Sequence, residues 1–269
     1  MLDVSHVSHH YAGGGRLWRK AAVPVLHDIS FTLEPGVCLG LLGVSGTGKS
    51  TLGKIILGLQ RPTAGRVCFA GHDCYTSDRR SLHSIRREVQ AVFQDCYSAV
   101  NPLMTAGQII GEPLRNYERL SPLEQKRRVA ELLEQVGLQA SDVDKRPAAF
   151  SGGQLQRINI ARAIALRPKL IVLDEAISSL DMVNQTQILS LLAQLRADYG
   201  MSYLFITHHV QAALTISDRI IVMDAGQIVY TANSPQALMK SQHPLVQQLI
   251  AARLPEHPSR RLDWSSSSL

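Results

Sequence analysis

The sequence predicts an α/β fold, in which buried parallel strands alternate with helices, and three apolar segments indicate it. Residues 37–42 form an apolar run that leads through a glycine-rich loop into a helical run at 52–59. Residues 170–173 and 203–206 are two further unbroken apolar runs. Runs without polar alternation suit parallel strands that helices cover on both faces, and such sheets belong to the α/β class.

The N-terminal part, residues 1–75, consists mostly of predicted strands and turns. Residues 29–33 alternate between apolar and polar, and a Pro-Gly turn at 35–36 precedes the first buried strand. A turn at 63–65 precedes another short strand at 66–70. This texture predicts a β-rich start to the fold.

Strands return near the other end of the chain. Two apolar runs, at 219–223 and 227–230, flank an Asp-Ala-Gly turn at 224–226. Short apolar runs on either side of such a turn predict a β-hairpin.

Residues from about 98 to 165 have a helical texture that the flanking segments lack. Ser121 is a capping residue, Pro122 suits a first helical position, and Glu124 follows in the first turn. Gly137 would end this helix. We therefore expect a helical lobe inserted into the α/β core. Apolar residues fall at helical spacing on one face: Val129, Leu132, Leu133 and Val136.

The chain has 269 residues, 45% of them hydrophobic, which is enough for one large domain with a substantial core. We expect residues 1–255 to form that domain, with the helical lobe inside it. Residues 256–269 end in a run of serines and are predicted to be a disordered tail.

Composition also bounds the location and the partners. No apolar stretch approaches the roughly 20 residues that cross a bilayer, and the N-terminus lacks the basic and apolar regions of a signal peptide. The chain is therefore expected to stay in the cytosol and to reach a membrane only through a partner. The net charge is +6, but the basic residues are spread out without interleaved aromatics, which favours solvated faces over nucleic-acid binding.

The cysteines show neither a Cys-x-x-Cys spacing nor a neighbouring histidine cluster. Free buried thiols in a reducing compartment are favoured over a metal site or disulfides. The cysteines are Cys38, Cys68, Cys74 and Cys96.

A phosphate-binding loop follows the first buried strand. Residues 43–51 fit the pattern G-x-x-x-x-G-K-[ST] at every fixed position. Glycines let successive N–H groups point inward, and the helix start adds unpaired N–H groups and a positive dipole end. Lys49 would reach the β- and γ-phosphates, and Ser50 would ligate Mg²⁺. The predicted nucleotide-binding residues are Gly43, Val44, Ser45, Gly46, Thr47, Gly48, Lys49, Ser50 and Thr51.

Two carboxylates end the apolar run at 170–173. Ligands of α/β sheets bind at the carboxyl ends of parallel strands, which is where Asp174 and Glu175 would lie. Asp174 could hold the hydrated Mg²⁺, and Glu175 could orient and deprotonate an attacking water. With Lys49, the pair indicates hydrolysis of the nucleotide rather than binding alone.

A second anion site is predicted at the start of a later helix. Ser151, Gly152, Gly153 and Gln154 precede a helical run at 155–166. A serine and two glycines at a helix start leave N–H groups free for an anion.

With these motifs the chain resembles the ATP-binding-cassette ATPases, from about residue 2 to residue 255. The resemblance implies a phosphate-loop NTPase core with a mixed sheet, an N-terminal antiparallel β subdomain and an inserted helical subdomain. It also implies that ATP and Mg²⁺ are the cofactors. In that family the serine–glycine motif of one subunit closes on the γ-phosphate held by the other, so Ser151–Gln154 would complete a partner's site.

The same resemblance assigns four further residues. Tyr11 would stack on adenine. Gln94 would sense Mg²⁺ and couple to the transmembrane subunits. The implied Mg²⁺ ligands are then Ser50, Asp174 and Gln94. The implied catalytic residues are Glu175, His208 and Gln94. Asp181, in the segment 179–181, would lie at the dimer interface, and His208 would contact the γ-phosphate.

Three residues depart from the family pattern. Phe150 stands where leucine is usual, and Ala176 replaces the common proline after the glutamate. His209 stands where aspartate usually follows the histidine, which removes a negative charge near the γ-phosphate.

Residues 94–102 and 241–245 resemble the dipeptide, oligopeptide and nickel importers within this family, and residues 144–147, 173–176 and 8–14 favour the nickel branch. We therefore expect an ATP-hydrolysing subunit that energises the import of nickel or a nickel chelate. A dipeptide or oligopeptide importer is the alternative. The ten histidines are expected to have structural or surface roles rather than to bind nickel.

The implied partners are a second ATPase subunit, in a homodimer or heterodimer, two membrane permeases and an extracytoplasmic binding protein, on the cytoplasmic face of a bacterial inner membrane. A cassette ATPase of DNA repair or translation would carry two cassettes or a long coiled coil, and neither occurs here.

Overall fold

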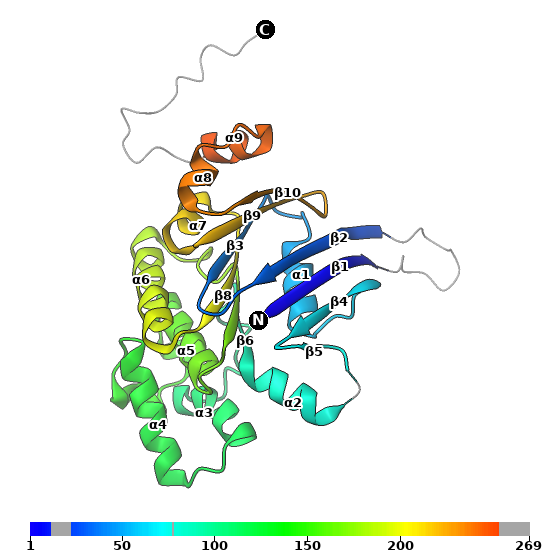
Figure 1. The fold of residues 1–269 in the computed structure, drawn as a ribbon. Helices are drawn as coiled ribbons and strands as arrows, with labels where there is room; N and C mark the ends of the chain where they lie inside the picture. Colours follow the sequence, from blue (N-terminus) through cyan, green and yellow to red (C-terminus); the bar gives the residue numbers. More distant parts are fainter. Residues whose placement is uncertain (12–22, 77, 253–269) are drawn as a thin grey trace, which may run out of the picture.

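The computed structural model of this chain describes residues 1–11, 23–76 and 78–252, and the strands form two sheets (Figure 1). One sheet is antiparallel, with four strands in the order β2-β1-β4-β5. The other has six strands in the order β10-β9-β3-β8-β7-β6 and is mixed. The predicted α/β fold with an N-terminal antiparallel sheet is therefore confirmed. The first sheet consists of β1 (Leu2–Tyr11), β2 (Val23–Leu33), β4 (Ala64–Phe69) and β5 (His72–Asp73).

The centre of the mixed sheet consists of the three apolar runs, β3, β8 and β7, in which every residue is buried. They run parallel, and β6 and β9 continue the parallel pairing on either side. Because the strands are parallel, their carboxyl ends meet at one edge of the sheet. The turn at 224–226 joins β9 to β10 in the predicted hairpin. The strands are β3 (Cys38–Leu42), β6 (Val89–Phe93), β7 (Leu170–Asp174), β8 (Ser202–Thr207), β9 (Arg219–Asp224) and β10 (Gln227–Ala232).

Helices cover both faces of the mixed sheet. Helix α1 lies between the two sheets, where Leu52 and Ile55 share one core with residues of β1 and β8 (Figure 1). Helices α3 to α6 share the core on the other side of the mixed sheet. The helices are α1 (Lys49–Ile56), α2 (Arg79–Glu88), α3 (Ala106–Tyr117), α4 (Pro122–Gln135), α5 (Gly152–Ile164), α6 (Met182–Tyr199), α7 (Val210–Ile216), α8 (Pro235–Met239) and α9 (Pro244–Ala251), with short 3-10 helices at Ala140–Asp144 and Pro147–Ala149.

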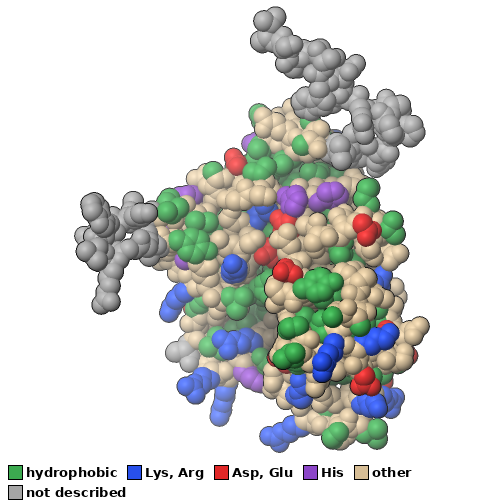
Figure 2. Space-filling view, turned by 180° about the vertical axis from the view of Figure 1, so that it is seen from behind, with side chains coloured by type: hydrophobic (Ala, Val, Ile, Leu, Met, Phe, Trp, Pro, Cys, Tyr) green, Lys and Arg blue, Asp and Glu red, His purple; other side chains and the backbone are tan. Residues whose placement is uncertain are grey.

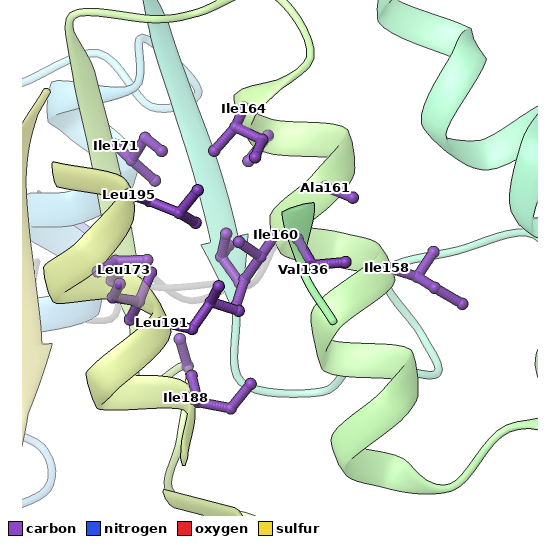
Figure 3. Close-up of a cluster of buried hydrophobic side chains, with 14 of the residues drawn as sticks. Val136, Ile158, Ile160, Ala161, Ile164, Ile171, Leu173, Ile188, Leu191 and Leu195 are labelled. Atoms are coloured by element: carbon purple, nitrogen blue, oxygen red, sulfur yellow. The ribbon is translucent and has the colours of Figure 1, made fainter. Parts of the chain in front are cut away.

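Helix α5 joins this helical layer to the sheet. Ile160 and Ile164 turn toward Ile171 of β7 and Leu195 of α6, whereas Ile158 points to the opposite side (Figure 3). All of these side chains are buried. The start of α5 is therefore tied to the strand that ends in Asp174 through one continuous apolar core.

The helix predicted from Ser121 is confirmed. Ser121 caps α4, accepting a hydrogen bond from the Glu124 N–H, and the Glu124 carboxylate accepts one from the Ser121 N–H. Gly137 follows the C-cap with a φ of 74°, the left-handed conformation that glycine tolerates. Helix α1 begins at Lys49, where the phosphate-loop motif predicts the helix start, and α5 begins at Gly152, three residues before the predicted helical run at 155–166.

The four cysteines are free, as predicted, but the prediction of burial is wrong for Cys68, which is half-buried. Val67 and Phe69 fill the inner face of β4, and the period of two places Cys68 on the outer face.

In the described part of the chain, no helix has both the length and the apolar character that a membrane crossing requires. The predicted disordered tail, 256–269, lies outside the described residues, and the limits of the helical lobe remain a prediction. Lys and Arg side chains are dispersed among acidic and apolar ones on the face shown in Figure 2.

Candidate functional site

The phosphate-binding loop connects β3 to α1 at the carboxyl edge of the mixed sheet. Gly48 has a φ of +96°, and a Cβ there would lie 2.8 Å from the Val25 carbonyl oxygen. At Gly43 a Cβ would collide with the carbonyl of Met223. Helix α1 has neither a side-chain cap nor an acidic residue in its first turn. Its first N–H groups and its positive dipole end are therefore available to an anion.

Lys49 is 4% exposed and folds back over this loop. Its Nζ donates hydrogen bonds of 2.8 Å to the carbonyl oxygens of Gly43 and Val44. Burial lowers the pKa of Lys49, and the carboxylates of Glu175 and Asp174 oppose that shift. The ammonium group thus lies between the loop and the two carboxylates at the end of β7.

Asp174 and Ser50 present two oxygen atoms side by side. The Ser50 hydroxyl donates to Oδ1 of Asp174 at 2.9 Å, across the ends of α1 and β7. Asp174 is 9% exposed, and burial raises its pKa, although the hydrogen bond from Ser50 acts in the opposite direction. A buried carboxylate beside a hydroxyl suits a hard divalent cation, which takes oxygen ligands and would offset the cost of burying the charge. The residues present therefore fit Mg²⁺.

Glu175 is held in a strained position by several contacts. Its φ is 51°, uncommon for a residue with a side chain, and its N–H donates to the Ile206 carbonyl at 2.9 Å. Oε2 accepts from the Ser178 hydroxyl at 2.7 Å and lies 2.8 Å from Nδ1 of His208. Such strain persists only where surrounding structure enforces it, and it is common at functional sites.

The same contacts keep Glu175 ionised. Burial would raise its pKa, but the hydrogen bonds from His208 and Ser178 outweigh that effect, so the pKa lies below its ordinary value. The side chain of His208 is half exposed. Glu175 is therefore an anionic proton acceptor, close to the loop, with an oriented imidazole beside it.

Gln94 follows the end of β6, next to the strand that carries Asp174. Phe93 pairs with Asp174 in the β6–β7 register, and the Gln94 carbonyl accepts from the Ser179 hydroxyl at 3.3 Å. The side chain of Gln94 is exposed. The residue therefore lies at the rim of the same edge.

Tyr11 ends β1 beside the start of α1. Its hydroxyl lies 3.3 Å from Oγ1 of Thr51 and donates to Oε1 of Gln60 at 3.1 Å. The side chain is 41% exposed. An accessible aromatic ring therefore adjoins the last residue of the phosphate-binding loop.

Ser151 and Gln154 cap α5 reciprocally. The Gln154 N–H donates to the Ser151 hydroxyl at 3.3 Å, and the Ser151 N–H donates to Oε1 of Gln154 at 2.9 Å. A Cβ on Gly153 would lie 2.6 Å from Oδ1 of Asn184, and one on Gly152 would lie 3.9 Å from Leu180. The turn thus lies against the segment that begins α6, and not beside Lys49 in these contacts.

Asp181 caps α6 in that neighbouring segment. Its Oδ1 accepts from the Asn184 N–H at 2.9 Å, and its Oδ2 accepts from the Asn184 side-chain amide at 2.5 Å. These bonds lower the pKa of the exposed Asp181 carboxyl. The predicted site residues therefore form two groups: one around Lys49 and Glu175, and one around Ser151 and Asp181.

Sequence reasoning missed a set of polar residues along α5. Gln156 donates to the carbonyls of Phe93 and Ala176, at 3.4 and 2.6 Å. Two more side chains of α5 hold the segment after Gln94: Asn159 donates to Cys96 O at 3.1 Å, and Arg162 donates to Ala99 O at 2.9 Å. The spacing of three between these polar residues, which puts them on one side of the helix, was the available signal.

His209 takes over a helix cap. Its Nδ1 accepts from the Ala212 N–H at 3.3 Å, at the start of α7. Burial and then the neighbouring His208 lower the pKa of His209. The ring thus caps the helix in its neutral form, without the negative charge of the usual aspartate.

Comparisons with known proteins agree with this geometry. Residues 26–178 match the family model described as ABC transporter. The chain is 43% identical over 261 residues to the nickel import ATP-binding protein NikE of Escherichia coli O157:H7, covering 97% of each chain. It is 45% identical over 231 residues to NikE of Shigella dysenteriae, covering 86% of each.

Solved structures have the same fold. The dimeric post-hydrolysis state of the ATP-binding cassette MJ0796, bound to ADP and Pi, matches with a TM-score of 0.76 and 29% identity, over 86% of this chain and 97% of that one. The structure of cbiO1 from Clostridium perfringens, part of the ABC transporter complex cbiONQ, matches with a TM-score of 0.77 and 25% identity, over 94% and 95%.

Proposed function

Because this chain belongs to the ABC transporter family, as an ATP-hydrolysing cassette subunit, we propose that it energises the import of nickel or a nickel chelate. One observation carries the choice of cargo: the 43% identity to a nickel import ATP-binding protein extends over 97% of both chains. Cassettes of this family act with membrane permeases. Here an extracytoplasmic binding protein would deliver the cargo to the permeases from the other side of the inner membrane. The cassette itself binds at the cytoplasmic face.

The group around Lys49 binds and hydrolyses ATP. The loop N–H groups and Lys49 hold the phosphates, and Tyr11 stacks on the adenine. Ser50, Asp174 and Gln94 would hold Mg²⁺, which would supply positive charge to stabilise the transferred phosphoryl group. Glu175 accepts a proton from the attacking water, and His208 contacts the γ-phosphate while keeping Glu175 oriented. The short contacts of Glu175 with His208 and Ser178 support these roles.

The group around Ser151 and Asp181 acts on a partner's ATP. Its two helix starts lie side by side, with Gly153 against Asn184, and the exposed residues Ser151 and Asp181 cap them. A second ATPase subunit, identical or homologous, would face this surface head to tail. ATP then favours the closed pair, and hydrolysis favours its opening.

The segment after Gln94 offers the permeases an apolar surface. Tyr97 and Leu103 are 52% and 74% exposed. The bonds from Asn159 and Arg162 attach this segment to α5. Movement of a permease would therefore reach both the Ser151 turn and Gln94.

The test is nickel uptake in the source bacterium with this gene deleted. Loss of radiolabelled nickel uptake, restored by the normal gene and not by Glu175→Gln, is the expected result. Uptake of a labelled dipeptide in the same strains serves as the comparison. Undiminished nickel uptake with loss of dipeptide uptake would replace the proposed cargo with peptides.

A further inference from the structure

Gln60 lies at the centre of a hydrogen-bonded network around the ring of Tyr11. Its Oε1 accepts from the Tyr11 hydroxyl at 3.1 Å, and its Nε2 lies 2.6 Å from Nε2 of His9. The rings of His9 and Tyr11 meet edge to face, with centroids 5.0 Å apart. One glutamine thus contacts both rings at the end of β1.

Each group in this network donates a hydrogen bond to the next, so all of the bonds can form at once. An amide nitrogen only donates, so Gln60 donates to Nε2 of His9, and His9 donates from Nδ1 to Oγ1 of Thr63 at 3.4 Å. At the other end, the Tyr11 hydroxyl already donates to Gln60 and therefore accepts from Thr51 at 3.3 Å. The chain of bonds runs from the phosphate-binding loop to the start of β4 without two donors in conflict.

The backbone of Gln60 is fixed independently of its side chain. Its carbonyl accepts from the Tyr75 hydroxyl at 2.6 Å, and that hydroxyl also contacts the carbonyl of Ile55 in α1. The Gln60 N–H donates to the Lys54 carbonyl at 3.3 Å. These two hydrogen bonds fix the Gln60 backbone beside the C-terminal end of α1, so that its side-chain amide reaches Tyr11.

His9 is a buried polar residue with no part in phosphate chemistry. It is 8% exposed, and burial and then His10 lower its pKa, which keeps the ring neutral and able to accept from Gln60. It packs edge to face with the Tyr11 ring. Tyr11 is nevertheless 41% exposed, so the ring remains accessible to a ligand.

From these contacts we infer that Gln60 is a positioning residue, which with His9 fixes the ring of Tyr11 for the purine of ATP. The inference rests on the proposed role of Tyr11 and adds to it. A ring held by its hydroxyl and by one edge loses little freedom when a base stacks on it, so less of the stacking energy is spent on ordering. The network therefore acts on the base and not on the phosphates.

The experiment compares ATP with inorganic triphosphate, which lacks the base, by equilibrium binding to the full chain carrying Glu175→Gln to prevent turnover. We expect Gln60→Leu to weaken ATP binding roughly three- to tenfold and to leave inorganic triphosphate binding unchanged. Gln60→Glu should retain most of the ATP affinity, because its oxygens accept from the Tyr11 hydroxyl and from the Nε2–H tautomer of a neutral His9. Gln248→Leu on α9, exposed and remote from the loop, is the matched control.

Tyr11→Ala separates the two hypotheses. We expect it to weaken ATP binding, and the double variant with Gln60→Leu to be no weaker than Tyr11→Ala alone. If Tyr11→Ala has no effect, the proposed adenine contact itself is wrong. If Tyr11→Ala weakens ATP binding but Gln60→Leu does not, or if Gln60→Leu weakens ATP and triphosphate equally, the positioning role is overturned.

Discussion

The carboxylate of Glu175 and the imidazole of His208 lie 2.8 Å apart at the ends of the neighbouring strands β7 and β8. The two residues are 33 positions apart in the sequence (208 − 175). Their contact exists only because β7 and β8 are parallel and end at one edge of the sheet. The Ser178 hydroxyl donates to the same oxygen, so two side chains converge on Oε2 of Glu175.

Glu175→Gln should stop turnover while ATP binding persists. The amide keeps the size of the side chain but cannot accept the proton, and loss of a general base costs roughly 10²- to 10⁴-fold in rate. The measurement is phosphate release by the assembled transporter, with ATP binding measured alongside. Activity within a few-fold of normal would remove Glu175 from the role of base.

Ser178→Ala should change the pH dependence of that reaction. The bonds from His208 and Ser178 hold the pKa of Glu175 below its ordinary value, so the base stays ionised as pH falls. Without the Ser178 hydroxyl the pKa rises, and the acidic limb of the rate profile moves to higher pH. The profile and an NMR titration of the Glu175 carboxyl should shift together. Ser141→Ala, on an exposed 3-10 helix, is the control and should leave both unchanged.

Ser151→Ala should affect stability and turnover by separate routes. Removing the cap of α5 costs about 1 kcal/mol of folding free energy, and the lost hydroxyl would also be missing from the partner's ATP site. Ser121→Ala removes a cap of the same kind from α4, with the same 3.3 Å bond to the N–H three residues on. Urea unfolding should show similar losses in both variants, whereas ATPase activity should fall only in Ser151→Ala. Equal activity in the two variants would contradict the proposed role of the Ser151 turn.

The motifs predicted the parts of the site that are local in sequence. The loop around Lys49 has fixed spacing, and the apolar run before Asp174 is long enough to mark a buried strand end. The family and the fold inferred from them are confirmed. Gln60 and Gln156 were missed because their partners come from other elements, and no local pattern records a tertiary contact. Ser178 was missed although its partner Glu175 is only three residues away, because no motif singled out its hydroxyl.

Burial was harder to predict than element type. The run at 66–70 was correctly predicted as a strand, but the thiol of Cys68 was expected to be buried, whereas the alternation along β4 leaves Cys68 on its outer face. Residues such as Asn159 and Arg162 posed the opposite problem. They are polar, yet they are directed inward because the segment after Gln94 presents unpaired carbonyls to α5.

His209→Asn should reduce the dependence of stability on pH. His209 caps α7 through a neutral Nδ1, and burial and His208 lower its pKa below 6.5 in the folded chain. The unfolded state therefore binds more protons near that pH, so the stabilisation is complete above 6.5 and is lost as pH falls through the folded pKa. Asparagine caps equally well but does not titrate.

Urea unfolding of both proteins at about pH 5.5 and about pH 7.5 tests this. The normal protein should lose more stability on acidification than His209→Asn, while the two should be close at the higher pH. His9, whose pKa is also lowered, titrates in both proteins and cancels in the difference. If the two proteins lose equal stability, the imidazole cap is not maintained in solution, and the start of α7 must be capped in another way.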